Sequence, residues 1–490
     1  MLRTASSPLS LRTGLKGVAQ VRRSLISRYI TSHTTPSNTP RIAIIGAGPA
    51  GLTLGSLLHR HRIPFTIYEY RQQPSENDYA QPSGMLDLHP GTGLAALEAC
   101  GVLDEFKARS VECGEAVKVA DKDGSVLWCM ESADDTQPEI SRHALTKLLL
   151  SKIPGECIRW EHRLTSAHHH NELGSSEQDI VDDHRFTLRF EDRSNPARLN
   201  TSPEVEVTAD LVVGADGAWS RVRSTLLDAH KPVNQRSPIY SGIHMITLDI
   251  ADLATRYPEL SALLGPGSFF GLGDGNVIIA QRGAHGAARM YLTVSTPEDD
   301  SLGMTAAMAP SVVRDMLLGP TTSSTNSEVR SWRNFSTWGP RLKELIAVGL
   351  EDLRNRDGRL DIRGMYMRPV DELGWSHCAG GTLLGDAAHL MTPFAGEGVN
   401  LALSDALDLA HAIIQAWDVT IATDSKDQPD DKRRMFKRTL DPLIQHTEKD
   451  MIARAEEPAQ EAWDNLQVFI GEDAAKKAAV LYQGWYPQPV

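Results

Sequence analysis

The sequence of 490 residues contains few cysteines and few aromatic residues, and it has no long apolar run. Its five cysteines are an odd number without Cys-x-x-Cys spacing, which argues against a disulfide framework and favours reduced thiols inside a cell. No stretch approaches the roughly twenty apolar residues of a membrane-spanning helix, and the start lacks the compact apolar segment of a secretory signal. We therefore expect a soluble, intracellular protein without a transmembrane segment.

Acidic residues are absent from the first forty positions, although the chain as a whole is acidic. The net charge is −13, and residues 1–40 carry six basic side chains, so the remainder carries −19. A body of this charge would repel phosphate backbones, which excludes nucleic acid as the expected partner. The basic, Ser-rich composition of 1–40 is shared by mitochondrial transit peptides and by disordered extensions, so both a mitochondrial and a cytoplasmic location stay open.

The first motif follows a short β-branched run, Arg41-Ile42-Ala43-Ile44-Ile45. It reads Gly46-Ala47-Gly48-Pro49-Ala50-Gly51 and leads into a leucine-rich helix that Pro64 ends. A second strand, Phe65 to Tyr68, then finishes in Glu69. Gly46 permits a tight turn, Gly48 lets the backbone approach a pyrophosphate, and Gly51 lets the helix pack on the strand. Glu69 stands where an acid accepts hydrogen bonds from a ribose, so the unit predicts a dinucleotide site, with NAD and FAD both open.

Two later segments bear on which dinucleotide binds. The run Ala209 to Gly217 is a strand that ends in the pair Asp216-Gly217, followed by Ser220, Arg221 and Arg223. The run Thr382 to His389 is a strand that ends at Gly385-Asp386, followed by Pro393-Phe394-Ala395-Gly396-Glu397-Gly398-Val399-Asn400 and a long helix.

These three motifs, in this order, resemble the class A flavoprotein monooxygenases of the para-hydroxybenzoate hydroxylase type. The resemblance covers most of residues 41–420. The runs Gly385–Asn400 and Gly84–His89 look most like the tetracycline-inactivating branch of that class.

The resemblance implies a role for each matched position. Asp386 would bind ribityl or ribose hydroxyls of FAD, and Gly396, Gly398 and Val399 would place backbone N–H groups against the flavin. Asp87 and Arg142 match positions that contact FAD, although alone they read as a turn residue and a surface arginine. Asp216 would serve both FAD and the nicotinamide donor, or only form a turn. His389 is expected to be structural rather than a base, and no metal site or catalytic triad is expected.

The reaction that the resemblance implies uses one dinucleotide site, filled by FAD, with NADPH or NADH as a transient co-substrate. Hydride reduces the flavin, dioxygen adds to it, and the flavin hydroperoxide transfers one oxygen atom to the substrate. Arg221 and Arg223 could attract the donor's phosphates or be a solvated pair.

The expected fold is α/β, with a Rossmann-like FAD domain made of residues 41–235 and 345–430. A β-rich substrate domain, 236–344, is inserted in it, and a helical segment, 431–490, bridges both. Strands near Ile243–Ile250, Val277–Ala280 and Met290–Val294 predict a largely antiparallel sheet. The polar stretch 165–205, with His168-His169-His170, predicts a mobile excursion, and a solvated loop is a simpler interpretation of the histidines than a metal site.

The substrate is the least determined part of the prediction. Thr247 and Gly273 stand where the tetracycline-inactivating enzymes use Gln and His, which argues against tetracycline. Phe269 and Phe270 would suit a planar pocket or ordinary core, so an aromatic or polyketide-like secondary metabolite is expected. The alternatives are a flavin reductase, a halogenase, although its Trp-x-Trp-x-Ile-Pro signature is absent, or a flavin-binding protein without oxygenase turnover.

Overall fold

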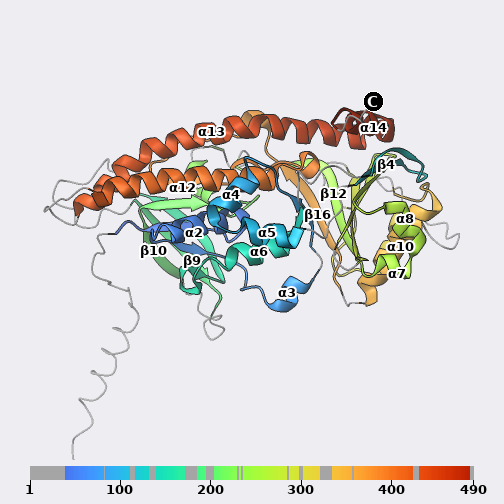
Figure 1. Ribbon diagram of the computed structural model, residues 1–490, viewed down its shortest axis with the longest axis horizontal. Helices are drawn as coiled ribbons and strands as arrows, with labels where there is room; N and C mark the ends of the chain where they lie inside the picture. The colour runs from blue at the N-terminus through green and yellow to red at the C-terminus, as the bar shows by residue number, and fades with distance from the viewer. Residues whose placement is uncertain are drawn as a thin grey trace, which may run out of the picture.

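The computed structural model describes residues 39–81, 83–110, 116–131, 139–170, 185–194, 204–228, 231–232, 236–283, 286–296, 302–319, 334–355, 358–422 and 430–485. Almost all of the predicted extension 1–40 lies outside these residues, so its targeting role stays a prediction. In Figure 1 the described chain forms two lobes side by side, and long C-terminal helices run along one side of both.

The first lobe is built on a five-stranded parallel sheet. Neighbouring strands in the order β17-β11-β1-β2-β7 all pair in parallel. Their side chains are mostly apolar and buried, as expected for a sheet covered on both faces. The predicted βαβ unit is confirmed, because α2 connects β1 to β2. The strands are β1 (Ile42–Ile45), β2 (Thr66–Tyr68), β7 (Ile158–Arg159), β11 (Leu211–Gly214) and β17 (Gly381–Leu383).

Helices pack beside this sheet, where α2 contacts α4, α6 and α12. Ser141 caps α6, where its hydroxyl accepts a hydrogen bond of 3.1 Å from the amide of Ala144. The predicted helix behind Ser141 is therefore confirmed, with Leu145, Leu148 and Leu149 buried. A two-stranded ribbon, β3 with β6, lies before it. The elements of this layer are α2 (Pro49–Arg60), α3 (Glu76–Ala80), β3 (Met85–Asp87), α4 (Gly93–Cys100), α5 (Leu103–Ser110), β6 (Glu139–Ser141), α6 (Arg142–Leu150) and η1 (Gly155–Cys157).

A three-stranded antiparallel sheet corrects the prediction of a mobile excursion over 165–205. Its strands are β8 (His162–His169), β9 (Phe186–Asp192) and β10 (Glu204–Ala209). Buried Phe186, Leu188 and Phe190 alternate along β9 with polar residues that face outward, and these polar residues hid the strand from composition alone. Residues 171–184 and 195–203 of the stretch lie outside the described residues.

The second lobe contains a seven-stranded sheet in the order β16-β12-β15-β14-β13-β4-β5. The predicted antiparallel character is confirmed, except that β13 and β4 pair in parallel. Only four strands come from 236–344, because β4, β5 and β16 belong to stretches that the sequence assigned to the FAD domain. Strands so distant in the chain pair without any pattern in the local sequence, so the sequence could not predict that they share a sheet. The strands are β4 (Val117–Asp121), β5 (Val126–Met130), β12 (Ile239–Ile250), β13 (Ser268–Gly273), β14 (Asn276–Arg282), β15 (Ala288–Ser295) and β16 (Asp361–Met367).

The outer face of the large sheet buries a separate core that includes Ile246, Leu248, Phe269 and Trp338. Phe269 is therefore a core residue without exposed surface, while Phe270 contacts Phe469 and Tyr482 of the C-terminal helices. The helices associated with the outer face are α7 (Leu253–Arg256), α8 (Pro258–Leu264), α9 (Pro310–Leu318) and α10 (Pro340–Asn355).

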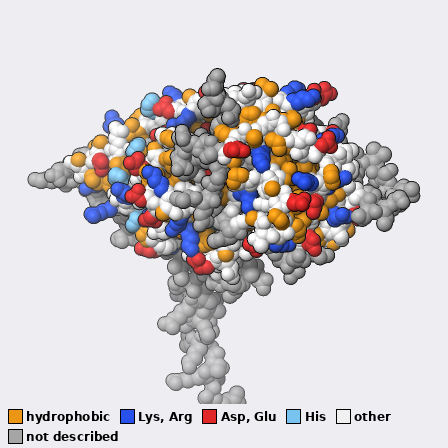
Figure 2. All heavy atoms as spheres, turned by 45° about the vertical axis from the view of Figure 1, so that its right-hand side comes forward, with side chains coloured by type: hydrophobic (Ala, Val, Ile, Leu, Met, Phe, Trp, Pro, Cys, Tyr) orange, Lys and Arg blue, Asp and Glu red, His pale blue; other side chains and the backbone are white. Residues whose placement is uncertain are grey.

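The chain ends in three helices, α12 (Gly398–Ala422), α13 (Asp430–Ile470) and α14 (Ala474–Trp485). Figure 1 shows α13 running beside α12 over the first lobe and on to the second, where α14 lies near β4. The predicted C-terminal bridge is therefore confirmed. Among the described helices, none combines the length and the hydropathy that crossing a membrane requires. The face in Figure 2 mixes acidic and basic side chains with apolar ones, which differs from the basic stripe of a nucleic-acid-binding surface.

Candidate flavin site

The glycine motif forms the turn between β1 and the N-terminus of α2. Gly46 has φ of +110°, and a Cβ there would overlap the carbonyl oxygen of Ala215. A Cβ on Gly51 would overlap the carbonyl oxygen of Gly46, so both glycines are required by the fold itself. Gly48 differs, because a Cβ there would meet no atom within 4 Å. This open position lies next to the helix start at Pro49, where free N–H groups bind phosphate.

Glu69 lies at the end of β2, and its side chain is 1% exposed. Its carboxylate accepts hydrogen bonds from the amide of Ala47 at 2.7 Å and from Nε of Arg71 at 2.8 Å. Burial alone would raise the pKa of Glu69, but the Arg71 guanidinium and these amides hold it below its usual value. The carboxylate is thus charged and fixed to the glycine turn, and its ribose contact stays a prediction.

The carboxylate of Asp216 is occupied by its own turn. It accepts hydrogen bonds from Ser220 Oγ at 2.5 Å and from the amide of Arg221 at 2.7 Å. Burial raises the pKa of Asp216 despite these contacts. The backbone of Asp216 lies beside Gly46, so the structure brings this motif to the glycine turn, but its carboxylate serves as a helix cap.

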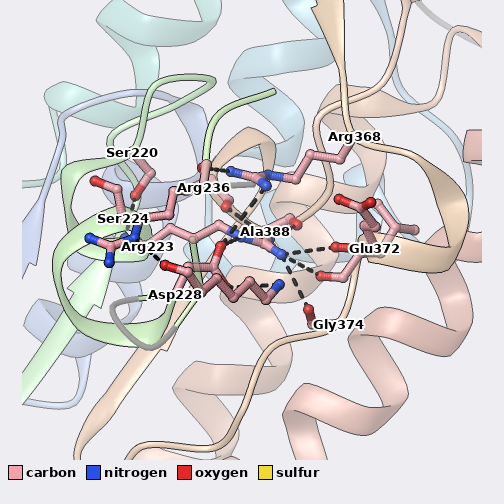
Figure 3. Close-up of polar contacts among 12 residues, drawn as sticks. Ser220, Arg223, Ser224, Asp228, Arg236, Arg368, Glu372, Gly374 and Ala388 are labelled. Carbon is pink, nitrogen blue, oxygen red and sulfur yellow. Dashed lines mark hydrogen bonds and ion pairs between the residues drawn. The ribbon is translucent and has the colours of Figure 1, made fainter. Parts of the chain in front are cut away.

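Arg223 is fully buried, so the interpretation of Arg221 and Arg223 as a solvated or phosphate-attracting pair is wrong for Arg223. Its guanidinium binds Asp228 at 3.0 Å, the carbonyl of Leu373 at 2.9 Å and the carbonyl of Ala388. Figure 3 shows this network, in which Arg368 also approaches Asp228. Arg223 therefore ties the short helix η4 (Arg223–Leu227) to the segment after β17.

The third motif follows β17 in a turn where Gly385 has φ of +57°. Asp386 begins the short helix α11 (Asp386–His389), and its side chain is exposed although its neighbours are buried. Asp405 of α12 accepts hydrogen bonds from the amide of Gly385 at 3.1 Å and from Nε2 of His389 at 2.6 Å. Burial alone would lower the pKa of His389. The Asp405 carboxylate has the larger total effect, so the pKa of His389 is raised. His389 is buried and paired, as a structural histidine should be.

The predicted flavin turn follows the short helix η8 (Pro393–Ala395). Gly396 has φ of +74°, and a Cβ on either Gly396 or Gly398 would meet no atom within 4 Å. Val399 lies in the first turn of α12, a helix of 25 residues whose positive end faces this open backbone. These positions therefore leave the room that a flat ring needs.

Asn400 was missed as a site residue, although its place in the first turn of a helix was visible in the sequence. Its side chain is fully buried; it accepts from the amide of His89 at 2.9 Å and donates to the carbonyl of Asp87 at 3.0 Å. His89 Nδ1 also lies 3.0 Å from Oε1 of Glu397, and this contact raises the pKa of His89. Asn400 therefore joins β3 to the flavin turn.

Asp87 pairs with Glu139 across the β3–β6 ribbon, and burial raises the pKa of Asp87. Arg142 lies at the start of α6, with its side chain exposed and its amide bound to the carbonyl of Gly84 at 2.8 Å. Asp87 therefore lies within the ribbon, and Arg142 directly follows its second strand.

The predicted site residues fall into two adjoining groups. Gly46, Gly48, Pro49, Gly51, Glu69, Asp216 and Asp386 gather at the carboxyl ends of the parallel strands, where ligands of such sheets bind. Asp87, Gly396, Gly398 and Val399 gather where the ribbon meets α12. Arg142 lies at the other end of the ribbon, at the start of α6. A Cβ on Gly385 would touch Ala50 and Ala402, so the two groups meet where α2 packs on α12.

This arrangement fits FAD. Gly48 would receive the pyrophosphate, Glu69 and Asp386 the sugar and ribityl hydroxyls, and Gly396–Val399 the flavin edge. Among the described residues, no three His, Cys, Asp or Glu side chains are placed to hold a metal. A cavity of about 940 Å³ lies elsewhere, between the β13–β14 turn and the α13–α14 turn, and none of the predicted FAD residues line it.

Comparisons with known proteins support FAD binding and place the chain in a family. The family model described as "FAD binding domain" matches residues 39–265 and 380–440. The chain is 36% identical over 466 residues to the monooxygenase penA of Penicillium thymicola, covering 89% of this chain and 97% of penA. It is 33% identical over 458 residues to the monooxygenase asqM of Emericella nidulans, covering 90% and 98%.

The fold is also similar to that of Klebsiella pneumoniae HpxO, solved in complex with FAD and uric acid. The TM-score is 0.60 at 17% identity, over 91% of this chain and 92% of HpxO. The likeness to the tetracycline-inactivating branch stays a prediction. Fold, motifs and relatives agree at the level of the class, and the chain therefore belongs to the FAD-dependent monooxygenases of class A.

Proposed function

We propose that this monooxygenase consumes NADPH or NADH and dioxygen to hydroxylate a small aromatic or polyketide-like metabolite. NAD(P)H supplies two electrons as hydride, one oxygen atom forms the new C–O bond, and the other leaves as water that contains the hydrogen of NAD(P)H and a proton from solution. The observation that carries the proposal is the open backbone at Gly48, Gly396 and Gly398, within a chain 36% identical to a named monooxygenase. The need for NAD(P)H suits the intracellular location expected from the cysteines.

FAD, when bound, supplies hydride acceptance and oxygen activation, and the protein supplies orientation and a dry site. Gly48 and the start of α2 bind the pyrophosphate. Glu69 and Asp386 orient the hydroxyls, and the turn at Gly396–Gly398 donates N–H groups to the ring edge. The positive end of α12 stabilises negative charge that develops there.

The substrate side is formed by the inner face of the large sheet. Ile246 and Leu248 of β12 point to the outer core, so Thr247 between them faces inward and pairs with Tyr291 of β15. A Cβ on Gly84 would overlap the Tyr291 hydroxyl, which places this face against the β3–β6 ribbon. Burial raises the pKa of Tyr291, so its phenol stays protonated as a hydrogen-bond donor.

Thr247 and Tyr291 offer hydroxyls on this face, and the guanidinium of Arg289 lies over the Tyr291 ring at 5.6 Å. Such a site suits a planar substrate with carbonyl or phenol groups. The names of the relatives support oxygenation. The uric acid in the HpxO structure shows that a protein of this fold holds a flat ring system.

The test is a turnover assay with a panel of phenols and aromatic polyketides under heavy-isotope dioxygen. The proposal predicts donor consumption matched by one labelled oxygen atom in the product. Donor oxidation that yields only hydrogen peroxide with every compound would favour a flavin reductase. Chlorinated product in the presence of chloride would favour a halogenase. Bound FAD without donor oxidation would favour a flavin-binding protein that has no oxygenase turnover.

A further inference from the structure

His89 lies directly after strand β3 of the ribbon, and its ring contacts the predicted flavin turn. Its Nδ1 is 3.0 Å from Oε1 of Glu397, which stands between the open positions Gly396 and Gly398. Both side chains are partly accessible, His89 at 21% and Glu397 at 27%. The histidine of the third motif, His389, is only 3% exposed. His89 is thus a titratable group with accessible surface at the flavin turn.

The backbone of His89 is held from two sides. Its amide donates a hydrogen bond of 2.9 Å to Oδ1 of the buried Asn400, and its carbonyl accepts one of 3.1 Å from the amide of Leu94. Asn400 also donates to the carbonyl of Asp87 at 3.0 Å, so α12 and the ribbon together fix the position of the imidazole. A reacting group needs this kind of support to keep one orientation.

The pairing with Glu397 decides which ring nitrogen of His89 can exchange a proton. An ionised carboxylate only accepts hydrogen bonds, so Nδ1 carries the hydrogen that is donated to Glu397. Within the part of the chain that the structure describes, Nε2 has no hydrogen-bond partner. In the charged ring Nε2 therefore offers an N–H for donation, and in the neutral ring it offers a free base.

Two acidic residues face His89 and favour its charged form. The Glu397 contact has the largest effect and Asp87 adds to it, and together they outweigh burial and raise the pKa of His89. Burial raises the pKa of Asp87, whose carboxyl group is hydrogen-bonded to Glu139 across the ribbon. Glu397 is therefore the main partner that keeps a proton on His89 at neutral pH.

The proposed reaction needs one proton from solution. The water that leaves contains two hydrogens, and NAD(P)H supplies only one of them. A site that excludes water needs a side chain to bring in the other. The carboxylates of Glu69 and Asp216 are bound within their own turns, and His389 is enclosed. His89 combines a titratable nitrogen, access and a place at the flavin turn.

We propose that His89 is the proton-transfer group of this site and that Glu397 holds it in position. The Nε2–H bond breaks as its proton passes to the oxygen atom that leaves as water, and the ring becomes neutral. Nδ1 keeps its hydrogen on Glu397 throughout, and a proton from solution then restores the charged ring. The inference rests on the proposed function and names the residue that supplies the solvent proton.

The first experiment needs no turnover. Diethyl pyrocarbonate acylates neutral imidazole nitrogens, and peptide mass spectrometry measures the reaction at each histidine. His89 should react faster as the pH rises, and FAD should slow its reaction because the cofactor covers the flavin turn. His61, exposed after α2, is the internal control and should react equally with and without FAD. In Glu397→Gln the rise at His89 should occur at lower pH. Equal labelling of His89 with and without FAD would overturn the inference.

The second experiment follows reoxidation of the FAD-loaded enzyme after reduction with dithionite. Without substrate, oxygen leaves as hydrogen peroxide, which takes two electrons and one hydrogen from the anionic reduced flavin and one proton from solution. At pH of about 7, His89→Gln should recover the oxidised spectrum at least about ten-fold more slowly than the wild type, per bound FAD. The wild-type rate should fall as the pH rises, whereas that of His89→Gln should stay flat. His61→Gln should behave as the wild type.

Glu397→Gln keeps the imidazole, so it separates proton transfer from folding. Its reoxidation rate should fall at lower pH than that of the wild type, because His89 loses its main partner. If His89→Gln and Glu397→Gln both matched the wild type within about two-fold at every pH, the inference alone would be overturned, provided that oxygen reoxidises the wild type. A wild type that oxygen does not reoxidise would overturn the proposed function as well.

Discussion

Arg454 of α13 donates a hydrogen bond of 2.9 Å to Oδ1 of Asp405, whose other oxygen accepts from the amide of Gly385 and from His389. Asp405 is fully buried, so its charge depends on these partners. Arg454 lies outside the segments that the FAD-domain model matches. The C-terminal helix therefore contributes to the motif that carries Asp386.

Arg454→Ala should reduce FAD retention. Removing one partner of a buried charge costs about 3–5 kcal/mol, and the cost here should be roughly 1–3 kcal/mol because Arg454 is partly exposed. Titration calorimetry of the apoprotein with FAD should show an increase in Kd of about ten-fold. Arg438→Ala, at an exposed arginine of the same helix, is the control. Equal FAD affinity in both variants would show that α13 does not support the site.

Gly48→Ala should fold normally and bind FAD poorly, because its new methyl group meets open space that the pyrophosphate would fill. Gly46→Ala should instead lower the yield of folded protein, because its methyl group overlaps Ala215 and its φ is +110°. Circular dichroism and the flavin absorbance of the purified proteins distinguish the two. Gly155→Ala, also open but remote from the motif, is the control. If Gly48→Ala kept full FAD occupancy, the turn would not be the phosphate site.

The contact of His89 with Glu397 should make the flavin turn pH-sensitive. Glu397 raises the pKa of His89, so the stabilisation is complete below the unfolded value of about 6.5 and is lost as the pH rises through the folded value. Tm measured from about pH 6 to pH 9 should therefore show a wild-type advantage over His89→Gln that shrinks toward high pH. An advantage that grew with pH would contradict the assignment.

Asp386→Ala should weaken FAD binding without unfolding the protein, because the side chain is exposed and would meet the cofactor's hydroxyls. Losing a charged hydrogen bond costs roughly 1.5–3 kcal/mol, so the FAD Kd should rise by ten-fold or more. Asp371→Ala, at another exposed acid in η7 (Val370–Glu372), is the comparison. Unchanged flavin occupancy in Asp386→Ala would remove Asp386 from the site.

The FAD lobe was largely predictable because its signals are local. The run Ile42–Ile45, the glycine turn and the helix behind it lie within twenty residues, and their spacing alone specifies a βαβ unit. The cap at Ser141 and the helix after Gly398 were visible for the same reason. The strand β9 was missed because its buried apolar residues alternate with polar ones, so the segment as a whole looks polar.

Contacts between distant segments could not be predicted from the sequence. The pairing of β4 with β13, the fixation of Asp87 by Asn400 and the support of Gly385 by Asp405 each join residues that lie many positions apart. Arg223 was indistinguishable from a solvated arginine until its burial was known. Such partners depend on the packing of the whole chain, and a single sequence carries no pattern for them.

The most direct test of the account is the visible spectrum of the purified protein through one cycle of reduction and reoxidation. It is recorded first as purified, then after anaerobic addition of NADPH or NADH, and again after oxygen is admitted. The account predicts a flavin spectrum that bleaches with the donor and returns with oxygen. A colourless protein that cannot be reconstituted with FAD would contradict it.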